Sequence, residues 1–323
     1  MPEPWQISVS IINYRTAEMT LACVESVLAD IGALQIHIAL VDNASGDGSV
    51  ASIEDWLAQH PDAPVTFVRS PSNTGFSGGH NLGIQAALAE HYLLLNSDAI
   101  LRPGALAAFL DAARVNPEAG LIGPRVEGED TTPHTSAFRY PTPLSELIRA
   151  AETGPITRIF ATRDVPLAPI PDPTQIEWVS FACVLIRHAL IEELGEMDEG
   201  YFMYFEDTDT CWRAAKAGWQ VIQAPDARMV HYRGGSAPVK KLAAAKKRLP
   251  GYFYAARTRV FFKLHGRIGL LAANLAWHLG RTIAQARRLV GKPVPQANAK
   301  EWRDIWINFH DPLGDRRAPE DAL

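Results

Sequence analysis

The sequence has few cysteines and no long hydrophobic run. Its three cysteines are too few for a disulfide framework and too widely spaced for a zinc site. The most apolar stretch, residues 268–279, is shorter than the roughly 20 residues that span a bilayer, and Asn274 and His278 interrupt it. The first residues, MPEPWQISVS, lack the basic and apolar regions of a signal peptide. We therefore expect a protein that stays in a reducing compartment, on the cytoplasmic side of the membrane.

Two common phosphate-binding motifs are also missing. The turn after the first predicted strand reads NYRTAE and contains no glycine, which excludes the dinucleotide-binding fingerprint at that position. The pattern GxxxxGK[ST] does not occur, which excludes a P-loop enzyme. The composition, with 47% hydrophobic and 21% charged residues, excludes wholesale disorder and is that of a folded globular protein.

Acidic residues are missing from residues 239–292, although this stretch carries 13 of the 31 Lys and Arg residues. Residues 1–238 carry 14 basic and 30 acidic residues, so one cationic segment stands in an otherwise acidic chain. This asymmetry predicts an anionic partner. Residues 240–292 are typical of helices with basic faces, which either lie on an anionic membrane surface or pack on the main domain as a helical pair. Nucleic acid is not expected as a partner, because no recognised motif accompanies the charge.

Short apolar runs alternate with helical patterns along the first part of the chain. This alternation predicts an α/β protein whose parallel sheet has helices on both faces. Residues 127–176, rich in Pro, Thr and acidic residues, are predicted to form a long loop or a small excursion from the domain, mobile over the active site. The predicted strands are 7–12, 36–41, 65–68, 92–95, 121–122, 178–186 and a short one ending near 230, and the predicted helices are 16–28, 49–59, one reaching 88, 103–115, 188–194 and 207–217.

Polar residues follow several of the predicted strands. Asn13, Asp42, Asn96 and Asp98 all fall at strand ends. Each alone is typical of a turn or a helix cap. Ligands bind at the carboxyl ends of parallel strands, so four such ends with the same polar character favour a binding site.

The motifs occur in a fixed order: SVSIINY, VDNASGDGS, NTGFSGGHNLGI, LLLNSDA, FEDTDTCWRAAKAG and VHYRGGS. Over residues 7–236 this series resembles the family 2 inverting glycosyltransferases, and among them the bacterial rhamnosyltransferases of cell-surface polysaccharide synthesis. The resemblance implies a GT-A fold with a mostly parallel central sheet flanked by helices. It implies a GT-A domain in residues 1–236, with a nucleotide-binding half (1–98) and an acceptor half (99–236), followed by a basic helical C-terminal region (237–323).

The resemblance also implies an activity. It indicates a metal-dependent, inverting transfer of L-rhamnose from dTDP-rhamnose, or alternatively of a GlcNAc, galactose or galactofuranose unit from a UDP-sugar. The implied acceptor is a saccharide or lipid-linked saccharide at the inner face of the cytoplasmic membrane. The protein would be a peripheral protein of that membrane, and it could form a homodimer. An alternative from another class is a catalytically inactive, membrane-associated binding protein on the same fold, because one acid of the metal motif is missing.

The resemblance places the donor and the metal at the strand ends. Asp42 resembles the residue that reads the pyrimidine ring, since a carboxylate accepts from the imide N–H of uracil or thymine. In the NSD motif, Asp98 is the implied carboxylate ligand of Mg²⁺ or Mn²⁺, and His231 can complete the metal site. Asn96 stands where the family motif has its first acid. Further donor-binding residues implied by the resemblance are Asn13, Tyr14, Asn43, Asn73, Gly75 and Asn96.

Inversion by single displacement needs one carboxylate to take the proton of the acceptor hydroxyl. By resemblance Asp207 is this base, Glu206 positions the acceptor, and Asp209 only caps the helix that begins here. The helix dipole favours the ionised form of acids in its first turn. Trp178 and Tyr204 are predicted to stack on the acceptor sugar.

Overall fold

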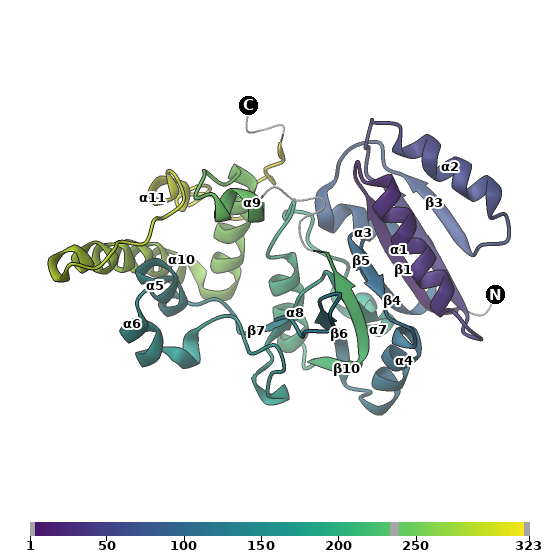
Figure 1. The fold of residues 1–323 in the computed structure, drawn as a ribbon, viewed down its shortest axis with the longest axis horizontal. Coiled ribbons are helices and arrows are strands. Elements are labelled where there is room, and N and C mark those ends of the chain that lie inside the picture. The colour runs from purple at the N-terminus through teal and green to yellow at the C-terminus, as the bar shows by residue number, and fades with distance from the viewer. Residues whose placement is uncertain (1–3, 233–238, 320–323) are drawn as a thin grey trace.

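An eight-stranded mixed sheet forms the centre of the protein in this computed structural model, which describes residues 4–232 and 239–319. The strand order is β3-β2-β1-β4-β9-β6-β10-β5, and the helical C-terminal region lies to one side, at the left of Figure 1. The strands of this sheet are β1 (Trp5–Asn13), β2 (Ile36–Asp42), β3 (Val65–Arg69), β4 (Ala89–Asn96), β5 (Ala99–Leu101), β6 (Ala119–Glu127), β9 (Cys183–Arg187) and β10 (Gln220–His231).

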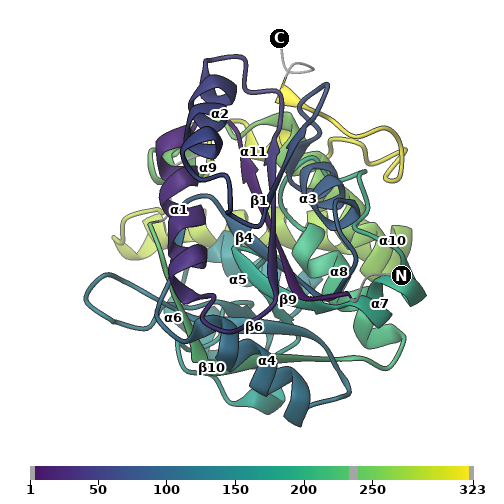
Figure 2. The same ribbon diagram turned by 90° about the vertical axis from the view of Figure 1, so that its right-hand side faces the viewer.

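Helices cover both faces of the sheet, as Figure 2 shows for α1 and α2 on one side of β1 and α3 on the other. A two-stranded ribbon of β7 (Ala137–Phe138) and β8 (Trp178–Val179) lies apart from it. The helices are α1 (Ala17–Asp30), α2 (Ser49–Gln59), α3 (Gly75–Gln85), α4 (Ala105–Val115), α5 (Pro143–Ala151), α6 (Gly154–Ile159), α7 (His188–Leu194), α8 (Glu206–Lys216), α9 (Val239–Ala244), α10 (Gly251–Ala286) and α11 (Glu301–Asp304).

The four N-terminal strands of the sheet are parallel, which brings their polar ends together. Asn13 stands opposite Asp42 on β2, and Ile12 stands opposite Asn96 on β4. The expectation of a mostly parallel sheet is right for β1–β4 and for the β6–β10 pair. It needs correction at β9 and β5, which are antiparallel to their neighbours.

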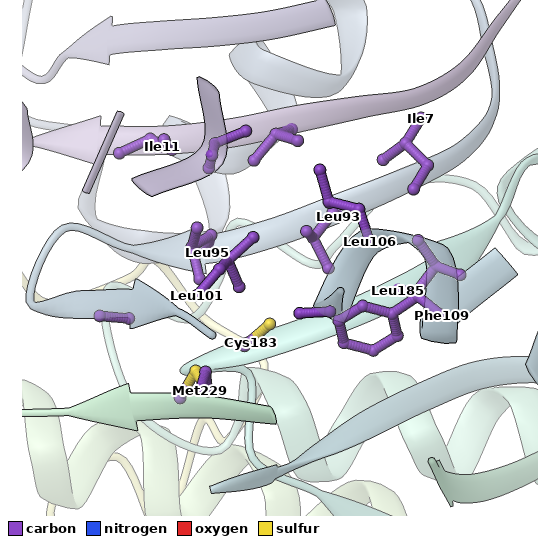
Figure 3. Close-up of a cluster of buried hydrophobic side chains, with 14 of the residues drawn as sticks. Ile7, Ile11, Leu93, Leu95, Leu101, Leu106, Phe109, Cys183, Leu185 and Met229 are labelled. Atoms are coloured by element: carbon purple, nitrogen blue, oxygen red, sulfur yellow. The ribbon is translucent and has the colours of Figure 1, made fainter. Parts of the chain in front are cut away.

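Both faces of the central strands are buried, which explains why each strand reads as a nearly continuous apolar run. Alternate side chains of one strand point to opposite faces, so Leu93 and Leu95 join one cluster and Tyr92 and Leu94 another. Figure 3 shows the first cluster, in which aliphatic side chains of β1, β4 and β9 gather with Leu106 and Phe109 of α4.

The glycines of α3 allow this helix to pack closely on β1. A Cβ at Gly83 would lie 2.0 Å from the hydroxyl oxygen of Ser10, and one at Gly79 would lie 2.7 Å from a side-chain carbon of Ile12. The NTGFSGGHNLG run is therefore explained in part by helix packing.

Residues 127–176 differ from the predicted loop. They contain β7, α5 and α6, and α5 begins with Pro143 after a capping box between Thr142 and Ser145. Its buried side packs against α10, where Gly280 approaches the Cβ of Ala150. The sequence pattern missed α5 because its partner helix lies more than a hundred residues away. Other boundaries also shift: residues 178–186 form two strands, and the last predicted strand begins at Gln220.

The C-terminal region is helical, as expected. Its longest helix, α10, is bent at Gly266, whose backbone angles of φ 66° and ψ −174° separate residues 251–265 from residues 267–286. No helix within the described ranges is long and apolar enough to cross a membrane. The domain boundary at residue 236 stays a prediction, since it falls among residues 233–238, outside the described part of the chain.

Candidate active site

A cleft of about 1390 Å³ opens at the carboxyl ends of the parallel strands and extends to the C-terminal region. Its wall combines the ends of β1 and β4, the start of α8 and the turn before α10. Most of the residues predicted from the sequence line this one cleft: Tyr14, Asn43, Asn73, Gly75, Asn96, Asp98, Tyr204, Glu206, Asp207 and His231.

Asn13 and Asp42 lie behind the cleft wall instead of on it. The side-chain amide of Asn13 donates to a carboxylate oxygen of Asp42 over 2.7 Å. The same oxygen of Asp42 accepts from the hydroxyl of Ser45 at 2.6 Å, and its other oxygen accepts from the backbone N–H of Ser45. Asp42 therefore holds the turn after β2, and its contact with a pyrimidine ring stays a prediction.

Trp178 is also outside the cleft lining. Its ring stacks on Phe138 with a centroid separation of 4.2 Å, and its indole N–H donates to the carbonyl of Arg139. Phe138 is the member of this pair that lines the cleft. The structure thus places Trp178 behind an aromatic wall, and its predicted contact with the acceptor sugar would pass through Phe138.

The loop before α3 is held by a network of side-chain amides. Asn43 donates to the carbonyl of Gly75 at 2.9 Å and accepts from the backbone N–H of Thr74 at 2.9 Å. Asn73 accepts from the N–H of Gly75 at 3.0 Å. These bonds hold the loop in the conformation that lines the cleft. Asn43 and Asn73 therefore determine the shape of the predicted donor pocket whether or not they contact a donor.

Gly75 joins the two sides of the cleft. Its φ of 73° is in the left-handed region, and a Cβ there would lie 2.0 Å from the carbonyl oxygen of Phe202. The next residue, Phe76, donates its N–H to that same carbonyl over 2.7 Å. A glycine is needed at this position because the loop before α3 touches the loop before α8 with no space for a side chain.

Asp98 and His231, the two residues predicted to bind a metal ion, lie next to each other. Strand β5 pairs with β10, with Ala99 opposite His231, and this places a carboxylate oxygen of Asp98 3.1 Å from Nε2 of His231. A carboxylate oxygen and an imidazole nitrogen suit Mn²⁺, and the oxygen also suits Mg²⁺. Within residues 4–232 and 239–319 no group of three or more His, Cys, Asp or Glu is arranged to hold a metal ion. An ion at this pair therefore needs further oxygen ligands from a bound molecule.

The backbone before the two predicted catalytic acids is strained. Tyr204 and Phe205 have φ angles of 75° and 69°, a left-handed conformation that is rare for aromatic residues and for two residues in succession. Such strain persists only where the surrounding structure enforces it, and it is concentrated at functional sites. Here it turns the chain so that α8 begins at Glu206, and both Glu206 and Asp207 face the cleft.

The two acids differ in how strongly their surroundings stabilise the ionised carboxylate. Burial raises the pKa of Asp207 to about 6 and raises the pKa of Glu206 well above its usual range, where the neighbouring charge of Asp207 adds to the effect. Asp207 accepts from the backbone N–H of Thr208 at 2.7 Å, whereas one carboxyl oxygen of Glu206 has no hydrogen-bond partner. Asp207 is thus the acid that ionises first, and burial together with the charge of Asp207 favours the protonated form of Glu206.

Asp209 does more than cap the helix, which corrects the expectation from the sequence. It is fully buried and pairs with Lys263 of α10 at 2.9 Å and with Arg213 at 3.2 Å. Lys263 also pairs with Asp198 at 2.6 Å, and Asp198 pairs with Arg259. This network fastens α8 to α10 behind the cleft. No motif predicted the link to α10, because Lys263 and Arg259 come from the segment that the sequence pattern describes only as basic.

The C-terminal region contributes cations to the cleft that the motifs did not indicate. Lys240, Arg248 and Arg317 line the cleft beside Leu249 and Tyr252. Arg316 donates to the carbonyl of Thr74 over 3.1 Å, so the C-terminal segment reaches the donor-side loop. These residues follow the last recognisable motif. The surplus of positive charge in residues 239–292 gave a signal for Lys240 and Arg248, and nothing in the sequence indicated Arg316 or Arg317.

Comparisons with known proteins agree with this geometry. Residues 8–163 match the family model described as Glycosyl transferase family 2. The chain is 31% identical over 233 residues to the N-acetylglucosaminyl-diphospho-decaprenol L-rhamnosyltransferase of Mycobacterium tuberculosis, covering 66% of this chain and 72% of that protein. It is 24% identical over 229 residues to the low-salt glycan biosynthesis hexosyltransferase Agl10 of Haloferax volcanii, covering 70% of this chain and 66% of that protein.

Two solved structures share the fold. The mannosyltransferase PcManGT from Pyrobaculum calidifontis, in complex with GDP-Man and Mn²⁺, superposes with a TM-score of 0.56 at 16% identity, covering 90% of this chain and 77% of that one. S. aureus TarS superposes with a TM-score of 0.52 at 13% identity, covering 95% and 81%.

Proposed function

This chain belongs to glycosyltransferase family 2 and is a glycosyltransferase with the expected GT-A fold, and on that premise we propose an inverting, metal-dependent mechanism with Asp207 as the base. One observation carries the proposal: a single cleft holds Asp98 beside His231 and also holds Asp207, the acid that ionises first. The acceptor hydroxyl gives its proton to Asp207 as it attacks the anomeric carbon of the donor sugar, and the nucleoside diphosphate leaves. Glu206, whose burial favours its protonated form, hydrogen-bonds to the acceptor, and Tyr204 packs against the acceptor's sugar ring.

We propose L-rhamnose as the transferred sugar and dTDP-rhamnose as the donor. The support is the 31% identity to a protein described as an L-rhamnosyltransferase. A UDP-sugar carrying GlcNAc, galactose or galactofuranose is the alternative. Asn13, Tyr14, Asp42, Asn43, Asn73, Gly75 and Asn96 remain the proposed donor-binding residues.

The proposed acceptor is a lipid-linked saccharide that carries a phosphate or diphosphate. Three cations, Lys240, Arg248 and Arg317, line the part of the cleft built by the C-terminal region, near Tyr204. Charged groups of this kind bind phosphate oxygens strongly. An acceptor that carries a diphosphate would place its anionic group against this wall while its sugar hydroxyl meets Asp207.

A donor and acceptor screen tests this function. We expect release of dTDP from dTDP-rhamnose with Mn²⁺ or Mg²⁺ present, and faster release with a short-chain lipid diphosphate GlcNAc than with neutral octyl GlcNAc. UDP-GlcNAc, UDP-galactose and UDP-galactofuranose serve as competing donors. If only a UDP-sugar is turned over, that sugar would replace dTDP-rhamnose as the proposed donor. If none of the four donors is turned over, the proposed activity would be contradicted.

Asp98 and His231 would hold the proposed Mg²⁺ or Mn²⁺, which neutralises charge on the leaving diphosphate when it is bound. Their donor atoms fit such an ion, with further ligands from the donor's phosphates. The presence of Asn96 in place of an acid no longer favours the alternative of an inactive binding protein, because His231 adds a second ligand atom beside Asp98.

Substitution of Asp98 by alanine is expected to lower kcat/KM by about 10²- to 10³-fold, a loss comparable to that of one electrostatic stabilising group. The Mn²⁺ concentration that gives half-maximal activity should rise in the same variant. Steady-state assays over a Mn²⁺ titration measure both effects, with His134→Ala, another cleft-lining change, as the control. An unchanged Mn²⁺ response in Asp98→Ala would remove Asp98 from the metal site.

The pH dependence of transfer follows from the pKa of the base. Asp207 accepts a proton only when ionised, and burial raises its pKa to about 6. Activity should therefore be lost as pH falls through about 6 and should level off above it. A kcat/KM profile measures this limb, and Glu206→Gln should retain it, because the carboxylate of Asp207 is still present in that variant. A profile that stays flat down to pH 4 would exclude Asp207 as the base.

We also propose that the enzyme works at an anionic membrane surface, through residues 240–292. A lipid-linked acceptor requires access to the membrane, and this segment is strongly cationic. The homodimer considered from the sequence stays an untested prediction.

A further inference from the structure

The second half of α10, residues 267–286, is apolar on two opposite faces. One face packs against α5: Trp277 is buried in a cluster with Ala150, and Gly280 approaches the backbone of α5. The opposite face carries four aliphatic side chains that remain exposed. Their exposed fractions are 85% for Ile268, 40% for Leu271, 55% for Leu275 and 55% for Leu279.

These four side chains form one stripe, which we call the outer stripe of α10. At about 100° per residue, Ile268, Leu271, Leu275 and Leu279 fall within an arc of about 80° on the helix surface. No Asp, Glu, Lys or Arg occurs in residues 268–280. The outer face of a helix on a globular protein is normally polar, and a contiguous apolar patch marks an interaction site.

The charges around the outer stripe indicate what it meets. Arg267, Arg288 and Lys292 are exposed near its two ends, and residues 239–292 contain no acid. A second copy of the same surface would bring these cations together, whereas anionic lipid headgroups complement them. An amphipathic helix with this arrangement lies in the plane of a bilayer interface, with its apolar face at the headgroup–acyl boundary.

We propose that the outer stripe of α10 inserts into the interface of an anionic membrane and thereby holds the enzyme on it. The proposal rests on the proposed function for its purpose, since a lipid-linked acceptor lies in that membrane. The binding itself requires neither donor nor acceptor. The helix then sits with its α5-packed face toward the protein and its aliphatic face toward the acyl chains.

Vesicle flotation with the full chain tests the proposal. Vesicles of phosphatidylcholine with about one third phosphatidylglycerol should bind the wild-type protein, and pure phosphatidylcholine vesicles should bind it weakly, because the attraction between the basic residues and anionic headgroups is lost. Leu275→Glu with Leu279→Glu should lower the partition coefficient at least tenfold, because two inserted side chains become charged. Both sites are exposed, so the fold should survive, which circular dichroism verifies.

The matched control is Val115→Glu with Ile170→Glu, which adds the same charge at side chains that are 65% and 72% exposed elsewhere on the protein. This variant should bind vesicles nearly as well as wild type. Equal losses in both variants would reduce the effect to net charge and overturn the proposal. A second outcome would also overturn the proposal. In it, sedimentation analysis shows a wild-type dimer that Leu275→Glu with Leu279→Glu converts to a monomer, and neither protein binds vesicles. Transfer to octyl GlcNAc in solution should be unchanged in all variants, so a failure of membrane binding remains distinct from a failure of the proposed activity.

Discussion

Replacement of Asp207 by asparagine is expected to slow sugar transfer by about 10²- to 10⁴-fold, while the nucleotide donor still binds. Asparagine has the same shape, and its amide oxygen can still accept from the N–H of Thr208, which now bonds to Asp207 over 2.7 Å. It cannot take a proton from the acceptor. Nucleotide release measures kcat, and calorimetry with dTDP and UDP in the presence of Mn²⁺ measures binding.

The neighbouring acid provides the control for this substitution. Glu206→Gln should lower kcat far less than Asp207→Asn, because burial and the adjacent charge raise the pKa of Glu206 and so disfavour the ionised form that a base requires. The opposite ranking, with Asp207→Asn active and Glu206→Gln inactive, would show that Glu206 is the base.

Replacement of Arg257 by methionine is expected to lower the free energy of unfolding by about 3–5 kcal/mol. Arg257 is 2% exposed and donates to Glu146 over 2.8 Å and to Asn274 over 2.8 Å. Methionine fills a similar volume but leaves the buried carboxylate of Glu146 with only Arg149 as a cationic partner. Urea unfolding followed by circular dichroism measures the loss.

A partly exposed arginine of the same region gives the comparison. Arg248→Met removes an ion pair with Asp304, but this carboxylate keeps Arg303 at 3.6 Å, and the 45% exposed position of Arg248 lets water enter the space that its side chain leaves. Its cost should be about 1 kcal/mol or less. Equal costs for Arg248→Met and Arg257→Met would mean that burial does not set the strength of these pairs.

The sequence was most informative where local pattern and burial agree. The apolar runs of β1, β2 and β4 could be predicted because both faces of these strands are covered, and the polar residues after them converge because parallel strands end at one edge. The start of α8 was predicted to within one residue, and its two acids do face the cleft.

What could not be predicted depends on partners that are distant in the chain. The sequence shows that Asp42 has a carboxylate. It does not show that this carboxylate already accepts hydrogen bonds from Asn13 and Ser45. It shows Asp209 in the first turn of a helix but not its pair with Lys263, 54 positions further on. Helix α5 was missed for the same reason, since its stability depends on packing against α10. Periodicity describes one segment at a time, whereas these contacts join segments that only the fold brings together.

The bend at Gly266 has a consequence for how the molecule would be oriented. Its backbone angles lie in a region that essentially only glycine occupies, so this one position fixes the angle between the two halves of α10. The half before the bend is anchored through the pair of Lys263 with Asp209, beside the proposed catalytic acids, and the half after it carries the outer stripe. A single residue without a side chain thus sets the tilt of the cleft above a lipid surface, and with it how far from that surface a sugar hydroxyl must stand to be glycosylated.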